Sequence, residues 1–154
     1  MSRRERIDDF LSQKRLAVVG VSRNRHDFTR VLFREFCQRG YDMVPVNPNL
    51  SEVEGRACYG RVQDVAPPVD GVLVMTSPSA TDQVVRDCAE AGVSRVWMYR
   101  AAGQGAVSAN AVAFCEEKNI GVVPGECPYM FFRDAGFIHR AHGFIRHLTG
   151  TMPK

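Results

Sequence analysis

Short apolar runs alternate with amphipathic stretches along this chain, and that alternation constrains the fold more than any other feature. The five runs cover residues 16–21, 42–46, 71–75, 95–98 and 120–123, at intervals of roughly 25 residues. Such spacing favours parallel strands, because each parallel strand needs a crossover that returns the chain to the same end of the sheet. The sequence therefore predicts an α/β fold, a Rossmann-like doubly wound parallel sheet of about five strands with helices on both faces.

Helix start and stop signals occur around these strands. The predicted helices cover residues 3–13, 28–39, 80–91, 108–118 and 137–148. Two of them begin with a capping box, a serine followed three positions later by an acidic residue: Ser2 with Glu5, and Ser79 with Asp82. The residues expected on the inner stripe of the second helix are Val31, Leu32 and Phe36.

Length and charge limit the number of domains and the kinds of partner. A chain of 154 residues with 45% hydrophobic content can bury one core, so residues 1–154 are interpreted as a single domain with its core at 13–132. The formal charge of +3, from 20 basic and 17 acidic residues, mildly favours anionic ligands. It is far below the charge of a typical nucleic-acid-binding surface, so we expect no nucleic-acid partner.

Cysteine usage and hydropathy bear on the cellular compartment. The five cysteines are widely spaced and include no C-x-x-C pair, so neither a disulfide framework nor a zinc site is predicted. The charged N-terminus lacks an apolar core of signal-peptide length, and no apolar run approaches the roughly 20 residues that span a bilayer. We therefore expect a cytoplasmic protein that does not enter a membrane.

The turn after the first predicted strand has the features of an anion site. Gly20 ends the apolar run, a short polar segment follows, and the next helix begins near Asp27. Backbone N–H groups and the positive end of that helix are therefore expected to converge at one point. Val21 and Ser22 would let the backbone approach a diphosphate closely, and the Ser22 hydroxyl would add a donor.

The same turn departs from the dinucleotide fingerprint. It reads G-x-S-x-x-x where that fingerprint reads G-x-G-x-x-G. Arg23 and Arg25 follow the serine and could cover the outer charge of a bound phosphate. Because a glycine also occurs at this position in doubly wound proteins that bind no nucleotide, the turn alone does not identify a ligand.

The end of the second predicted strand distinguishes between nucleotides. A protein that binds NAD usually places an Asp or Glu there, which accepts hydrogen bonds from the ribose hydroxyls. Here the residues are Asn47 and Pro48. The amide lacks that acceptor and would tolerate a phosphate on the ribose better than a carboxylate. The alternative is that Asn47 and Pro48 form only a turn.

Six short motifs occur along the chain. They are Ala17-Val18-Val19-Gly20-Val21-Ser22, Val46-Asn47-Pro48-Asn49, Glu54-Gly55 with Cys58-Tyr59, Thr76-Ser77-Pro78, Val96-Trp97-Met98 and Gly125-Glu126-Cys127-Pro128. With these motifs in this order, the chain resembles the bacterial family of small stand-alone CoA-binding proteins, which is related to the nucleotide-binding domain of the succinyl-CoA synthetase alpha subunit. The resemblance covers roughly residues 13–132.

This resemblance implies a set of ligand-binding residues. They are Gly20, Val21, Ser22, Arg23, Arg25, Asn47, Pro48, Thr76, Ser77, Pro78 and Met98. The glycine turn would hold the CoA diphosphate, with the two arginines as phosphate partners. The Asn-Pro pair would lie along the adenosine 3′-phosphate, and the Thr-Ser-Pro segment would border the adenine and ribose.

Two regions depart from the family pattern. Relatives commonly continue from the Trp-Met strand into a Gln-Pro-Gly type of turn, whereas residues 99–105 read YRAAGQG here. That loop would face the pantetheine end of the ligand. The tail from residue 133 onward extends past the matching part, and its apolar stripe is typical of a helix packed on the sheet or on a second subunit.

Candidates for chemistry are few. Cys127 lies in a turn after the fifth predicted strand, but the sequence shows no base beside it, and a buried structural thiol is the more common explanation. His139 and His142 could share a metal, but no third ligand has suitable spacing. No catalytic residue and no metal site are predicted.

We therefore expect a module that binds coenzyme A or an acyl-CoA through the diphosphate and adenosine, without chemistry of its own. The ligase relatives use a phosphohistidine from a second domain, for which this chain lacks the length. An NAD(P)-dependent oxidoreductase on the same fold is one alternative, disfavoured by the missing third glycine and substrate domain. A docking subunit of a larger acyl-CoA enzyme is another, and the partners considered are that enzyme and a second copy of the chain.

Overall fold

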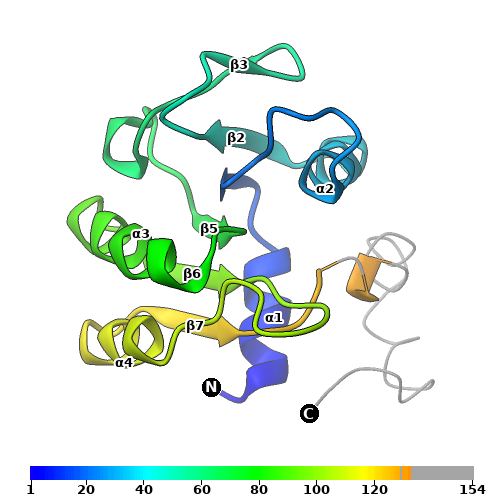
Figure 1. Ribbon diagram of the computed structural model, residues 1–154. Coiled ribbons are helices and arrows are strands. Elements are labelled where there is room, and N and C mark those ends of the chain that lie inside the picture. Colours follow the sequence, from blue (N-terminus) through cyan, green and yellow to red (C-terminus); the bar gives the residue numbers. More distant parts are fainter. Residues whose placement is uncertain (129, 133–154) are drawn as a thin grey trace.

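A five-stranded parallel sheet forms the centre of the molecule (Figure 1). The computed structural model describes residues 1–128 and 130–132. The strands of the sheet are β1 (Arg15–Val19), β2 (Asp42–Val46), β5 (Gly71–Val74), β6 (Arg95–Met98) and β7 (Gly121–Pro124), in the spatial order β2-β1-β5-β6-β7. All four strand pairs are parallel, so the predicted Rossmann-like α/β fold is confirmed.

The strand order reverses between β1 and β5. From β1 the chain crosses to β2 at one edge of the sheet, and it then returns to the other side of β1 as β5. In sheets of this kind ligands bind outside the carboxyl ends of the strands at the point of reversal. Pro45 lies in β2, which is an edge strand, as expected for a residue that cannot donate to a central ladder.

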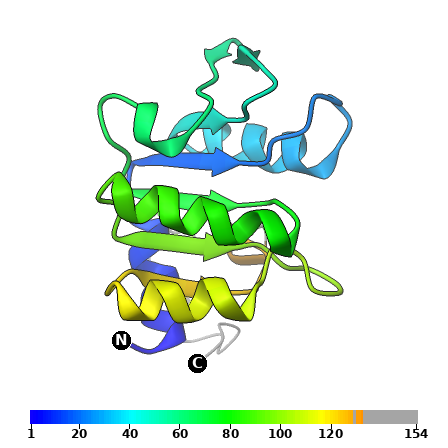
Figure 2. The same ribbon diagram turned by 60° about the vertical axis from the view of Figure 1, so that its left-hand side comes forward.

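Within the described residues, helices α1 (Arg3–Leu11) and α2 (Phe28–Gln38) cover one face of the sheet and α3 (Pro78–Glu90) and α4 (Ala109–Glu117) the other (Figure 2). Helices α1 and α2 contribute Ile7, Phe10, Leu32, Phe33 and Phe36 to one apolar cluster. Helices α3 and α4 pack on the opposite face and form a second cluster. No helix in the described ranges has both the length and the apolar character needed to cross a bilayer.

Most helix starts agree with the sequence signals. The Ser2 and Glu5 capping box of α1 is present in both directions, with distances of 3.1 and 2.7 Å. The prediction for α3 was wrong at its start: the N-cap is Ser77, and the helix begins at Pro78 rather than at residue 80. Proline suits the first helical position, because its φ is already helical and the N–H it lacks would have no partner there.

The prediction of which α2 residues face the core was also partly wrong. Val31, expected on the inner stripe, is only partly buried, whereas Leu32, Phe33 and Phe36 are fully buried together with the charged Arg30. The buried stripe therefore includes an arginine in place of the valine.

Residues between β2 and β5 form little regular structure. A small antiparallel hairpin of β3 (Glu52–Val53) and β4 (Arg56–Ala57) lies above β2 in Figure 1, and a 3-10 turn, η1 (Val62–Asp64), follows. Further along, Tyr59 forms a parallel bridge with Val46. The hairpin is thereby attached to the end of β2. The closing helix predicted over 137–148 lies outside the described residues.

Candidate functional site

Gly20 brings the turn after β1 against the end of β5. Its φ is +102°, and a Cβ at this position would lie 2.7 Å from the carbonyl oxygen of Met75 and 3.2 Å from Cγ2 of Thr76. Only glycine can occupy such a position without a shift of the backbone. The turns after β1 and β5, predicted to share a ligand, are therefore in direct contact.

Asn47 joins the end of β2 to the same turn. Its Nδ2 donates to the carbonyl of Val21 at 2.9 Å, and its Oδ1 accepts from the backbone N–H of Asn49 at 2.8 Å. The hydrogen bonds between β1 and β2 continue one residue past β1, since the N–H of Gly20 donates to the carbonyl of Val46 at 3.2 Å. The amide thus connects two loops of the candidate site.

The turn after β1 leaves alternate backbone N–H groups open. The N–H of Ser22 donates to Oγ1 of Thr29 at 2.9 Å, and that of Asn24 donates to Oγ of Ser22 at 3.0 Å. Within the described part of the chain, the N–H groups of Val21 and Arg23 have no hydrogen-bond partner. The Ser22 hydroxyl, expected to be a donor to the ligand, accepts inside the turn and keeps its own proton available.

The helix that follows the turn is already capped by an acid. Asp27 is the N-cap of α2, and its Oδ1 accepts from the N–H of Thr29 at 2.9 Å. A carboxylate at this end opposes a second anion, so the expectation that the positive end of α2 holds the phosphate needs correction. Helix α3 differs, because its N-cap Ser77 makes no side-chain capping bond and its first turn contains no acidic residue. The positive end of α3 therefore lies open at the same edge of the sheet.

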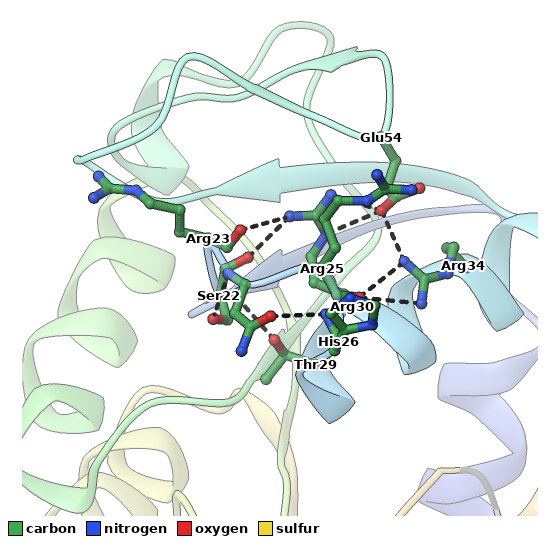
Figure 3. A network of polar contacts seen from close by, with 9 residues as sticks. Ser22, Arg23, Arg25, His26, Thr29, Arg30, Arg34 and Glu54 are labelled. Atoms are coloured by element: carbon green, nitrogen blue, oxygen red, sulfur yellow. Dashed lines mark hydrogen bonds and ion pairs between the residues drawn. The ribbon is translucent and has the colours of Figure 1, made fainter.

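A buried arginine holds the turn in shape (Figure 3). The side chain of Arg30, in the first turn of α2, donates from Nη1 to the carbonyls of Ser22 and Arg23 at 3.1 and 3.4 Å. Its Nε and Nη2 donate to Oε2 of Glu54 at 3.0 and 2.6 Å. Only 8% of Arg30 is exposed. One guanidinium thus connects α2, the β3–β4 hairpin and the turn of residues 20–27 after β1. We call residues 20–27 the anion turn, after the ligand that the sequence predicts for them.

Glu54 lies at the tip of the hairpin and binds a second arginine. Nη1 of Arg34 donates to Oε2 of Glu54 at 2.9 Å, and the same guanidinium donates to the carbonyl of Arg25 at 3.3 Å. Partial burial acts to raise the pKa of Glu54, but the hydrogen bonds from Arg30 and Arg34 outweigh it and lower that pKa below 4.5. The carboxylate is therefore ionised wherever the protein is folded near neutral pH.

The pH dependence of stability should report this network. Because the pKa of Glu54 is lowered on folding, its contribution is present above the ordinary value of 4.5 and is lost as the pH falls through the lowered value. We expect wild-type protein to lose stability below pH 4.5 relative to Glu54→Gln, while their difference stays constant above about pH 6. Denaturant unfolding of both proteins from pH 3 to 7 measures this, and an unchanged difference throughout would show that Glu54 is not coupled to the arginines.

The predicted phosphate partners Arg23 and Arg25 are separated in the structure. The guanidinium of Arg23 donates to the carbonyl of Asn49 at 3.2 Å, and Figure 3 shows it pointing away from Arg30 and Arg34. Arg25 is exposed and contributes its carbonyl to Arg34. These two arginines therefore flank opposite sides of the turn.

Arg30 and Glu54 are not among the ligand-binding residues that the sequence predicts, and their pairing was not predicted. A signal for Arg30 was available, since it lies three residues before the buried Phe33 and six before Phe36, on the apolar stripe of an amphipathic helix. A charge at such a position requires a buried partner. The sequence does not identify Glu54 as that partner, because the pairing joins residues 24 positions apart.

Some polar groups of the segment after β5 form hydrogen bonds within the protein. Oγ1 of Thr76 is 2.9 Å from Oγ1 of Thr81, which donates to the carbonyls of Ser77 and Ala106. Ser77 and Pro78 begin α3 at the open end described above. Met98 differs from the other expected ligand residues, because its side chain is fully buried in the cluster beneath α3 and α4. Its neighbours Tyr99 and Arg100, both partly exposed, lie at the edge instead.

Cys127 lies beside Tyr99 at the carboxyl end of the sheet and is only 6% exposed. Burial, with smaller contributions from Cys127, raises the pKa of Tyr99 to about 12. A tyrosine that stays protonated at neutral pH is a poor general base for a neighbouring thiol. Burial also raises the pKa of the Cys37 and Cys58 thiols, which opposes formation of reactive thiolates. His139 and His142, considered as metal ligands, lie outside the described residues.

A cavity of about 410 Å³ lies at the other end of the sheet. It is lined by residues of α1 and of the loops that precede β6 and β7, including Arg6, Asp9, Arg95 and Asn119. Arg95 already pairs with Asp9 at 2.7 Å. Since ligands of doubly wound sheets bind at the carboxyl ends of the strands, we assign the candidate site to the turns around Gly20 and not to this cavity.

A family model described as a CoA binding domain matches residues 14–133 of the chain. The chain belongs to this family of CoA binding domains. The match includes the turn after β1, the end of β2 and the end of β5, which meet in the site described above.

This CoA binding domain is similar to other chains of comparable length. It is 27% identical over 114 residues to the uncharacterized protein YneT of Bacillus subtilis, a match that covers 74% of this chain and 82% of that protein. A hypothetical protein from Pyrococcus horikoshii OT3 has a similar structure, with a TM-score of 0.78 and 25% identity over 86% of this chain and 91% of the other.

The same fold also occurs within a longer chain. The apo form of a dinucleotide-forming acetyl-coenzyme A synthetase 1 from Ca. Korarchaeum cryptofilum is similar with a TM-score of 0.62 and 24% identity. The similarity covers 71% of this CoA binding domain but only 25% of the synthetase chain. It shows that the fold is used both alone and as one part of a larger protein.

Proposed function

We propose that this protein binds coenzyme A or an acyl-CoA at the turn after β1, through the diphosphate and adenosine of the ligand, and performs no chemistry on it. The observation that carries the proposal is the contact between the turns at Gly20 and Thr76, where the strand order reverses, in a chain that belongs to a family of CoA binding domains. Both turns have backbone groups suited to an anion.

Three groups support a diphosphate at this place. The open N–H groups of Val21 and Arg23 can donate to phosphate oxygens, and the uncapped end of α3 adds a positive potential. The exposed guanidinium of Arg25 lies on the same loop. The negative charge of Asp27 belongs to the helix cap, so we propose that the phosphates lie toward the α3 side of the turn.

Asn47 supports CoA over NAD. The position where NAD-binding proteins usually present a carboxylate to the ribose holds an amide, which is already bonded to the turn through Val21. A neutral group here does not repel the 3′-phosphate that CoA carries and NAD lacks.

Calorimetric titration of the purified protein with CoA, dephospho-CoA, NAD and NADP tests the proposal. We expect CoA to bind, dephospho-CoA to bind about tenfold more weakly because it lacks the 3′-phosphate, and NAD and NADP to bind weakest. Binding of NAD without a response to CoA would overturn the proposal and favour an oxidoreductase. A separate incubation of the protein with acetyl-CoA, followed with a thiol reagent, tests the absence of chemistry, and release of free CoA would overturn it.

A further inference from the structure

Arg100 follows β6 at the same edge of the sheet as the anion turn. Its guanidinium lies on the backbone of Gly125, where an added Cβ would be 3.0 Å from Nη2 and 3.3 Å from Nε. Its own backbone N–H donates to the carbonyl of Glu126 at 3.1 Å. The side chain thus lies along the carboxyl end of β7, over a glycine whose missing Cβ makes room for it.

The charge of Arg100 is not neutralised within the described residues. No hydrogen bond or ion pair of its guanidinium occurs there, although the side chain is partly buried. Two other partly buried arginines have acidic partners, Arg95 with Asp9 and Arg39 with Glu35, and the partly buried Arg6 donates to the carbonyl of Val122. The nearby carboxylate of Glu126 is bound to Arg3 at 3.2 Å. A partly buried arginine fork without a partner is suited to an incoming carboxylate.

The loop that begins with Arg100 is held closed. The N–H of Ala106 donates to the carbonyl of Tyr99 at 2.8 Å, and Gly105, with a φ of +59°, lies against the same carbonyl and the Arg100 Cα. The N–H of Tyr99 donates to the carbonyl of Val74 at 3.0 Å. The base of the Arg100 side chain is therefore fixed to the end of β5, next to the anion turn.

An apolar surface lies between the anion turn and Arg100. The ring of Phe28, at the start of α2, lies 5.9 Å from the ring of Tyr99, and Phe28 is 40% exposed. The guanidinium lies at the end of β7, which is three strand spacings from the end of β1, or about 14 Å. That separation lies within the reach of the pantetheine arm of a CoA bound through its diphosphate at Gly20.

We propose that Arg100 determines acyl-group specificity: it binds the free carboxylate of a CoA thioester formed from a dicarboxylic acid. This inference rests on the proposed function, because the ligand must be anchored at the anion turn. The thioester would lie along the Phe28 and Tyr99 rings, and the terminal carboxylate would accept two hydrogen bonds from the fork of Arg100. Acyl groups that end in a methyl would leave the guanidinium without a partner.

Titration with matched pairs of thioesters tests this specificity. The pairs are malonyl- and propionyl-CoA, succinyl- and butyryl-CoA, and glutaryl- and valeryl-CoA, which have equal numbers of acyl carbons. We expect the wild-type protein to bind at least one dicarboxylic thioester about fivefold more tightly than its match. Arg100→Gln should remove that preference and leave the affinity for free CoA unchanged, while Arg100→Lys should retain part of it.

Arg86→Gln is the matched control, since Arg86 is an exposed arginine of α3 with no partner among the described residues. It should keep the full preference. Equal affinities within every pair, or a preference that persists in Arg100→Gln, would overturn the inference while the proposed function stands. Failure of free CoA to bind to the wild-type protein would overturn both. Thermal unfolding of each variant shows whether the fold is kept, and Arg100→Lys decides the result if Arg100→Gln does not fold.

Discussion

Gly20→Ala should destabilise the protein by about 3 kcal/mol and weaken CoA binding at least about tenfold. The added Cβ would lie 2.7 Å from the Met75 carbonyl oxygen, and the backbone has a φ of +102°, which residues with a Cβ rarely adopt. Met75 directly follows the central strand β5, so its carbonyl group has little freedom to move. The turn must therefore shift away from β5, and the two halves of the candidate site separate.

Gly40→Ala is the matched control for this substitution. Gly40 has a similar φ of +94°, but an added Cβ would meet nothing within 4 Å. This variant should lose only about 1 kcal/mol, the cost of the backbone conformation, and should bind CoA as the wild-type protein does. Denaturant unfolding and calorimetric titration of both variants measure the two effects. Equal stability losses in the two variants would show that contact with Met75 does not constrain the turn.

Arg30→Gln should destabilise the protein by about 2–3 kcal/mol and also weaken CoA binding. The substitution removes the hydrogen bonds to the carbonyls of Ser22 and Arg23 and leaves Glu54 with one arginine instead of two. Since Arg30 is the residue that connects α2, the turn and the hairpin, its loss should release the turn from both neighbours. Affinity should fall although Arg30 itself need not touch the ligand.

Arg34→Gln serves as the control, because Arg34 binds the same carboxylate but is more exposed and makes no contact with Ser22 or Arg23. Its loss should cost about 0.5–1 kcal/mol and leave CoA affinity unchanged. A double-mutant cycle of Arg30→Gln with Glu54→Gln should give a coupling of about 1 kcal/mol or more. Strict additivity in this cycle, or a larger effect from Arg34→Gln, would contradict the assignment of Arg30 as the positioning residue.

The candidate site was predictable where it depends on strand ends. Turns at Gly20, Asn47 and Thr76 follow apolar runs, and a parallel sheet places the carboxyl ends of its strands at one edge whatever the side chains are. The contact of Gly20 with Met75 and Thr76 shows that the predicted turns do meet. The family resemblance placed Met98 among the ligand-binding residues, but strand residues alternate between faces, and the side chain of Met98 is fully buried.

The internal hydrogen bonds of the turn were not predictable in the same way. The expectation that the positive end of α2 would hold the phosphate followed from the order of strand, glycine and helix. Asp27 and Thr29 instead satisfy part of that end and part of the turn, which shifts the open anion-binding groups toward α3. Several polar side chains lie near each backbone N–H of the turn. Which of them accepts its hydrogen bond depends on small differences in distance that the spacing of residues along the sequence does not determine.

Periodicity and turn residues alone were sufficient to place the five strands of the sheet and helices α1 to α4 on its two faces, and they predict an anion site in the turn after the first strand. These properties follow from local backbone preferences and from the burial of one stripe per helix, which each segment encodes by itself. Only the tertiary structure decided the ion pair of Arg30 with Glu54 and the hydrogen bond of Asn47 to Val21. It also placed the guanidinium of Arg100 over Gly125, without a partner among the described residues. These contacts join residues that are far apart along the chain. Whether a charged side chain has an oppositely charged neighbour is therefore determined only when the segments pack together.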